Sequence, residues 1–117
     1  MATVQRKSGR ECGYNAEWDR ESLHYRRQHP LCLGCEAMGR VTPTKVTDHI
    51  QPHRGSKTLF WDPLNRQPAC RWHHDVVKQR LERMWDAGEI GVDELRLDSA
   101  AALEVARRAE AAATHGV

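Results

Sequence analysis

Four residues in the middle of the chain have the types and spacing of a closed zinc site. Cys32 and Cys35 form one pair, Cys70 and His73 form a second, and two residues separate the members of each pair. That spacing allows one tight turn to aim both side chains of a pair at one ion, and four such donors complete a tetrahedral site. The sequence therefore predicts a structural Zn²⁺ bound by these four side chains.

A second set of polar residues lies between and beside these pairs. Asp48 and His49 are adjacent, Asn65 precedes the second pair, and His74 follows directly on His73. A carboxylate, imidazoles and an amide are what a second, open metal site needs in order to hydrolyse a phosphodiester. Because neighbouring residues on a helix diverge by about 100°, His73 can face the zinc while His74 faces this second site.

Size and composition agree with a fold that is stabilised by a bound metal ion. At 117 residues the chain predicts one domain, and four of its seven aromatic residues are tryptophan. Such a polar chain has a thin core, which a bound metal would reinforce. No apolar leader or span of transmembrane length is present, so we expect no membrane partner, a cytoplasmic location and reduced thiols. Clustered cysteines then favour zinc over disulfides. Cys12 could replace one of the four ligands, but its distance from them in the sequence favours a free thiol.

Charge is unevenly distributed along the chain. Residues 1–80 carry 14 Lys/Arg against 8 Asp/Glu, whereas residues 81–117 carry 4 against 8. The basic part contains the metal motifs, which suits a polyanion docking there. An ordinary solvated surface is the alternative, and charge alone does not decide between them.

The order of predicted elements is helix, knuckle, strand, loop, strand, helix, helix. We expect helices at 15–28, 71–87 and 99–113, strands at 46–50 and 67–69, and a long loop at 51–65. Asn15 and Ser99 are the expected N-caps, and Gly88 ends the middle helix. The first helix has Trp18, Leu23 and Tyr25 as expected anchors, and the buried stripe of the middle helix is expected at Val77, Leu81, Met84 and Trp85. The apolar stretch 59–61 should pack part of the loop into the core, and Gly34 permits the tight turn of the knuckle.

We interpret residues 1–13 as a flexible basic N-terminal segment, residues 14–90 as the main domain, and residues 91–117 as an acidic, alanine-rich helical tail. The tail carries none of the motifs, so we expect it to be dispensable for cleavage.

Strand alternation raises one difficulty for the second site. Val46, Asp48 and Ile50 fall on one face of the predicted strand, whereas Thr47 and His49 fall on the other. Asp48 and His49 can serve one site only if it lies at a strand end or if the metal binds from the strand edge.

Together these residues resemble the HNH nuclease family, most closely the small HNH proteins of phages and prophages, over residues 18–85. The matching pieces are His-Pro-Leu-Cys-Leu-Gly-Cys, Thr-Asp-His-Ile-Gln-Pro-His, Phe-Trp-Asp-Pro-Leu-Asn-Arg-Gln and Ala-Cys-Arg-Trp-His-His-Asp-Val-Val-Lys. The resemblance implies an α+β fold with a ββα-metal core. His73 departs from the family pattern, which has cysteine there, and Arg66 stands where tryptophan is usual.

The resemblance implies a role for each residue of the second site. His49 would be the general base, since its ordinary pKa is near neutrality. Asp48 and His74 would hold Mg²⁺ or Mn²⁺, and Asn65 would brace the loop and orient His49. His53 is either an aid at the phosphate or, slightly favoured, a solvated loop residue. Further contacts to DNA phosphates are expected from Arg54, Lys57, Arg66 and Lys78.

We therefore expect an HNH endonuclease that nicks or cuts double-stranded DNA as a monomer or weak dimer. The resemblance suggests phage DNA packaging as one setting, with the tail as the candidate contact for terminase subunits. Two alternatives stay open: a zinc-stabilised DNA-binding module without cleavage, and a terminase accessory protein.

Overall fold

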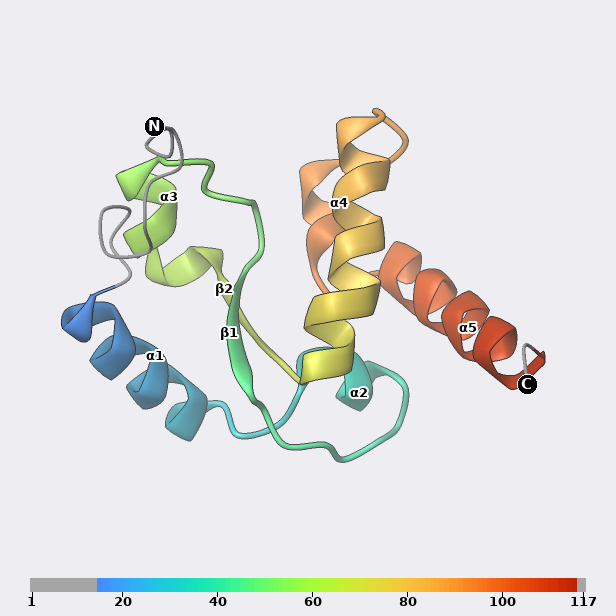
Figure 1. Ribbon diagram of the computed structural model, residues 1–117, viewed down its shortest axis with the longest axis horizontal. Helices are drawn as coiled ribbons and strands as arrows, with labels where there is room; N and C mark the ends of the chain where they lie inside the picture. The colour runs from blue at the N-terminus through green and yellow to red at the C-terminus, as the bar shows by residue number, and fades with distance from the viewer. Residues whose placement is uncertain (1–14, 116–117) are drawn as a thin grey trace, which may run out of the picture.

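The computed structural model describes residues 15–115, and side chains as far as Ala113. Residues 1–13, expected to form a flexible basic segment, and Cys12 lie outside this range. In chain order the elements are α1 (Ala16–Gln28), α2 (Leu33–Ala37), β1 (Val46–His49), α3 (Lys57–Trp61), η1 (Pro63–Asn65), β2 (Arg66–Ala69), η2 (His73–Val77), α4 (Lys78–Asp86), η3 (Val92–Leu95) and α5 (Ala100–His115). Helices and a two-stranded sheet give a mixed α+β architecture (Figure 1).

The sheet is a small antiparallel pair of strands. β1 and β2 pair with Val46 opposite Ala69 and Asp48 opposite Gln67. Both predicted strands are confirmed, with ends that differ by one residue. Within the described residues β1 pairs with β2 alone, so its second edge is not covered by a strand.

The connection between the strands is more ordered than its sequence predicts. The expected loop of residues 51–65 contains α3 and η1. Ser56 caps α3 by accepting a hydrogen bond from the Leu59 backbone N–H at 3.2 Å. Phe60 is completely buried, as the apolar Leu59–Trp61 stretch predicts. The residues after β1 are thereby held against the sheet.

The sheet lies between α1 on one side and α4 on the other (Figure 1). On the α1 side, Ser22 donates a hydrogen bond to Thr47 of β1 at 2.7 Å between the hydroxyl oxygens. Asn15 caps α1 as predicted, and Trp18 is buried. Leu23, expected as an anchor, is instead 41% exposed, because the helix presents its other face to the strand.

The helix that follows β2 runs from Arg71 to Asp86 with a π turn, η2, inside it. The Lys78 N–H reaches the His73 carbonyl, five residues back, and the sequence pattern does not predict this wider turn. Val77, the last residue of η2, and Leu81 of α4 are fully buried, as their helical spacing predicts. Gly88, with a φ of 75°, follows the helix end at the predicted place.

The C-terminal segment belongs to the core. Ser99 caps α5 by accepting a hydrogen bond from the Ala102 N–H at 3.0 Å. Leu95 and Leu97 pack in one cluster with Val77 and Leu81 of the preceding helix, and Ala102, Val105 and Ala106 of α5 complete it. The segment expected to be dispensable thus supplies buried apolar surface, so its removal would disturb the fold. Among the elements described here, none is a helix long and apolar enough to cross a membrane.

Candidate functional site

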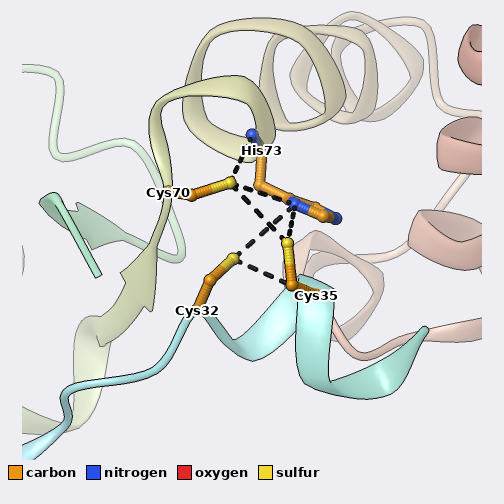
Figure 2. A group of neighbouring side chains, drawn as sticks. All are labelled: Cys32, Cys35, Cys70 and His73. Atoms are coloured by element: carbon orange, nitrogen blue, oxygen red, sulfur yellow. Dashed lines mark hydrogen bonds between the residues drawn. The ribbon is translucent and has the colours of Figure 1, made fainter. Parts of the chain in front are cut away.

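The four predicted zinc ligands converge. Cys32 caps α2, Cys35 lies within α2, Cys70 follows β2, and His73 begins the π turn; all four side chains are buried (Figure 2). Their ligand atoms lie within 4.8 Å of one another. In the described part of the chain, no other group of three or more His, Cys, Asp or Glu residues meets this criterion.

The spacing of these atoms matches a tetrahedral zinc site. Bonds of about 2.3 Å to sulfur and about 2.0–2.1 Å to nitrogen place sulfur atoms roughly 3.8 Å apart and sulfur roughly 3.6 Å from nitrogen. The Cys35 and Cys70 sulfurs are 3.8 Å apart. His73 Nδ1 lies 3.6 Å from the Cys32 sulfur and 3.5 Å from the sulfurs of Cys35 and Cys70. The donor set and its geometry therefore fit Zn²⁺.

Both turns are built in the same way. The Cys35 N–H donates to the Cys32 sulfur, and the His73 N–H donates to the Cys70 sulfur, each at 3.4 Å. These bonds favour thiolates, whereas burial raises the pKa of the Cys32 thiol to about 12. A bound cation resolves that conflict, because it stabilises thiolates that burial alone disfavours.

Gly34 is required by close packing. A Cβ at this position would lie 2.2 Å from Cδ2 of His73. Its backbone is helical, so the turn freedom that the sequence indicates is not the reason for glycine here. Glycine makes room for the imidazole ligand.

A cavity of about 620 Å³ lies beside β1. The predicted site residues Asp48, His49, His53, Arg54 and His74 all line it. Residues that the sequence did not indicate line it as well: Trp18, Arg26, Lys45, Arg71 and Glu82. The cavity therefore gathers the proposed catalytic groups together with several cations.

Asp48 and His74 face each other. His74 Nε2 lies 3.7 Å from Asp48 Oδ1, within the roughly 4.2 Å that one ion with bonds of about 2.1 Å can span. His74 Nδ1 lies 2.8 Å from a carboxylate oxygen of Asp75, which can only accept, so neutral His74 carries its lone pair on Nε2. This carboxylate–imidazole pairing is typical of metal-binding histidines. The pair fits a divalent cation.

His49 is held in one tautomer by its surroundings. Its ring stacks on Trp18 with centroids 5.2 Å apart, and Nε2 lies 3.0 Å from the Phe60 carbonyl oxygen. Because a carbonyl can only accept, Nε2 carries the hydrogen and Nδ1 keeps its lone pair. Burial lowers the pKa of His49 to about 4, so the ring is neutral at pH 7.

Residues from both faces of β1 line the same cavity. Thr47 and His49 contact α1, and Asp48 faces the helix that carries His74, which agrees with strict alternation. The cavity nevertheless includes residues of both helices and of β1. Because β1 ends at His49, this geometry agrees with a site at the strand end as well as with access from the strand edge.

Asn65 stabilises the connection between the two strands, as predicted. Its Nδ2 donates to the carbonyls of Gln51 and Leu59, and its Oδ1 accepts from the Gln51 N–H. The Leu59 peptide precedes Phe60, whose carbonyl holds His49. Asn65 does not line the cavity, so its influence on His49 passes through the backbone of α3.

Three of the expected DNA contacts do not line the cavity. Lys78 is completely buried, with Nζ 2.6 Å from the His49 carbonyl, 2.9 Å from Glu82 and 3.1 Å from Asp48. Arg66 pairs with Glu21 at 2.9 Å and lies over the Trp18 ring. Lys57 is exposed but does not line the cavity. Helix packing therefore gives Lys78 and Arg66 structural partners in place of phosphates.

A scan against protein-family models, a search of curated proteins and a search of solved structures each find no match to this chain. Membership of the HNH family stays a prediction that rests on the motif residues.

Proposed function

We propose that this protein is a metal-dependent HNH endonuclease that hydrolyses phosphodiester bonds in double-stranded DNA. The observation that carries the proposal is the convergence of Asp48, His49 and His74 in one cavity beside a Cys₃His cluster. Two strands followed by a helix, with the base on the first strand and His74 on the helix, agree with a ββα-metal core.

The chemistry assigns one task to each group. His49 accepts a proton from water at Nδ1, the water oxygen bonds to phosphorus, and the bond from phosphorus to the 3′ oxygen breaks. The leaving oxygen takes a proton from solvent, which gives 5′-phosphate and 3′-hydroxyl ends. A divalent ion held by Asp48 and His74 would neutralise charge on the phosphate and on the leaving oxygen.

Cations at the cavity wall favour a polyanionic substrate. Arg26, Lys45 and Arg71 come from α1, the segment before β1 and the start of the second long helix, and all three line the cavity. Within residues 15–113 none of the three forms an ion pair with a carboxylate, so their charge is available to phosphates. Arg54, in contrast, pairs with Asp86.

One experiment tests cleavage. The zinc-loaded chain should nick supercoiled plasmid in Mg²⁺ or Mn²⁺ and not in EDTA, and Asp48→Ala should abolish the difference. A chain that binds DNA but never nicks it, with any divalent ion, would contradict the proposal.

That negative result would favour the DNA-binding module. One observation supports this second candidate: Lys78 lies 3.1 Å from Asp48 and already compensates its charge. The module predicts DNA binding that is indifferent to divalent ions and to Asp48→Ala.

A second experiment tests whether the cations that line the cavity contact DNA. Replacing Arg71 or Lys45 by alanine should reduce the slope of log affinity for duplex DNA against log salt by about 0.9 per cation. Arg80→Ala is the matched control, since Arg80 is exposed on the same helix as His74 but does not line the cavity. Equal slopes for Arg71→Ala and the unmodified chain would remove Arg71 from the substrate interface.

A further inference from the structure

Gln67 is a buried polar residue that the proposed mechanism does not use. It lies on β2 directly opposite Asp48, and it is 1% exposed. Its Nε2 donates to Asp48 Oδ2 at 2.9 Å and to the Leu95 carbonyl at 3.1 Å, and its Oε1 accepts from the Leu97 N–H at 2.9 Å. A single amide thus joins the candidate site to the C-terminal segment.

The orientation of this amide is determined by its partners. A backbone N–H can only donate and a backbone carbonyl can only accept, so the oxygen must face Leu97 and the NH₂ group must face Leu95. The second hydrogen of that NH₂ group is then directed to Asp48. A flipped amide would place two acceptors together and two donors together, each buried. The turn at residues 95–97 therefore decides which atom Asp48 meets.

The two oxygens of Asp48 have different surroundings as a result. Oδ2 is held by Gln67 at 2.9 Å and by Lys78 at 3.1 Å. Oδ1 lies 3.7 Å from Nε2 of His74, which lines the cavity. With Oδ2 engaged, the carboxylate offers one oxygen to a cation in the cavity.

We infer that Gln67 is a positioning residue for Asp48, anchored by the turn at Leu95–Leu97, and that the C-terminal segment thereby forms part of the divalent-ion site. The inference rests on the proposed function, because it concerns the ion that Asp48 and His74 would hold. It gives the segment expected to be dispensable a role in the site, beyond its apolar packing. Loss of the amide should free the carboxylate to rotate, so that the ion site must be ordered on binding.

The test measures ion binding without DNA. Mn²⁺ affinity of the zinc-loaded full chain is compared with that of Gln67→Met, which keeps the side-chain length and removes all three hydrogen bonds. We expect the affinity to fall by at least about tenfold, the usual effect of losing a partner that orients a metal ligand. Val105→Ala is the matched control, since it weakens α5 packing in the same core without touching Gln67. It should bind Mn²⁺ as the unmodified chain does.

The outcomes separate the inference from the proposed function. Unchanged Mn²⁺ affinity in folded, zinc-loaded Gln67→Met would overturn the inference, as would an equal loss in Val105→Ala. If Gln67→Met does not fold, Mg²⁺ titration of the unmodified chain followed by NMR decides. The Gln67 side-chain amide signals should shift together with the His74 ring signals, and unmoved amide signals would overturn the inference. If the unmodified chain binds neither ion at His74, the proposed function fails first and the inference falls with it.

Discussion

The Cys₃His cluster and the cavity are built on different principles, although His73 and His74 are neighbours in the chain. In the cluster, two short turns bring four donors to ligand spacing, and each turn uses the same N–H to sulfur bond. In the cavity, Asp48 and His74 come from distant elements and lie 3.7 Å apart. Their arrangement depends on buried partners, above all Gln67 and Lys78. Local turns thus specify the structural site, whereas a long-range network specifies the candidate catalytic site.

The two sites also differ in how their negative charge is balanced when no metal ion is bound. In the cluster a bound cation would compensate three buried thiolates. In the cavity Lys78 already lies beside Asp48, so the protein can fold with that site empty of metal. We therefore expect zinc to be needed for folding and the divalent ion to be needed for activity alone.

The largest expected effect is the loss of the cluster. Cys35→Ser should unfold the chain or leave it insoluble, because structural zinc contributes about 10–16 kcal/mol in small zinc domains. Elemental analysis of the unmodified protein should give about one zinc per chain. Cys12→Ser, at the cysteine that is not one of the four predicted ligands, serves as the control and should keep both zinc and melting temperature. A metal-free chain that melts normally would contradict the comparison.

Next comes removal of the C-terminal segment. Truncation after Gly91 should lower the melting temperature sharply, because it exposes Val77 and Leu81 and deletes the anchors of Gln67. Truncation after Ala113 removes residues beyond the last buried position described, Ala109, and should be tolerated. Thermal melting followed by circular dichroism distinguishes the two. A stable chain ending at Gly91 would show that the tail is separable after all.

His49→Ala should keep the fold, zinc and DNA binding while plasmid nicking falls by at least about 10²-fold, which is the usual contribution of a general base. Raising the pH should restore part of the rate, since hydroxide from solvent can replace the missing base. Nicking by His49→Ala at the rate of the unmodified chain would refute the assignment of the base.

His74→Ala should respond to metal more than to pH. It removes a neutral ligand, so a higher Mg²⁺ or Mn²⁺ concentration should recover more nicking than alkaline pH does. Asp48→Ala should show the same pattern more severely, because it removes the charged ligand and leaves Lys78 buried without that partner. Equal rescue of His49→Ala, His74→Ala and Asp48→Ala by metal would refute the division of roles within the cavity.

Much of this protein follows from residues close together in the sequence. Paired spacing indicated the four zinc donors, since a tight turn needs only its own residues to aim two side chains. Asn15 and Ser99 marked two helix starts and Gly88 a helix end, because capping satisfies backbone groups within one turn. The separate directions of His73 and His74 followed from helix geometry alone.

Other features depended on elements that meet only in the folded chain. Lys78 was expected to contact phosphate, yet packing buries it between Asp48 and Glu82. The spacing of residues in the sequence does not predict whether a lysine is buried. The contact between Gln67 and Asp48 depends on strand register, which a one-residue shift would abolish. The tail's few apolar residues gave no sign of docking, because the surface that receives them is made by another helix. Tertiary structure decided these features because Asp48 lies 19 positions from Gln67 in the chain, and because the surface that receives the tail is created by folding.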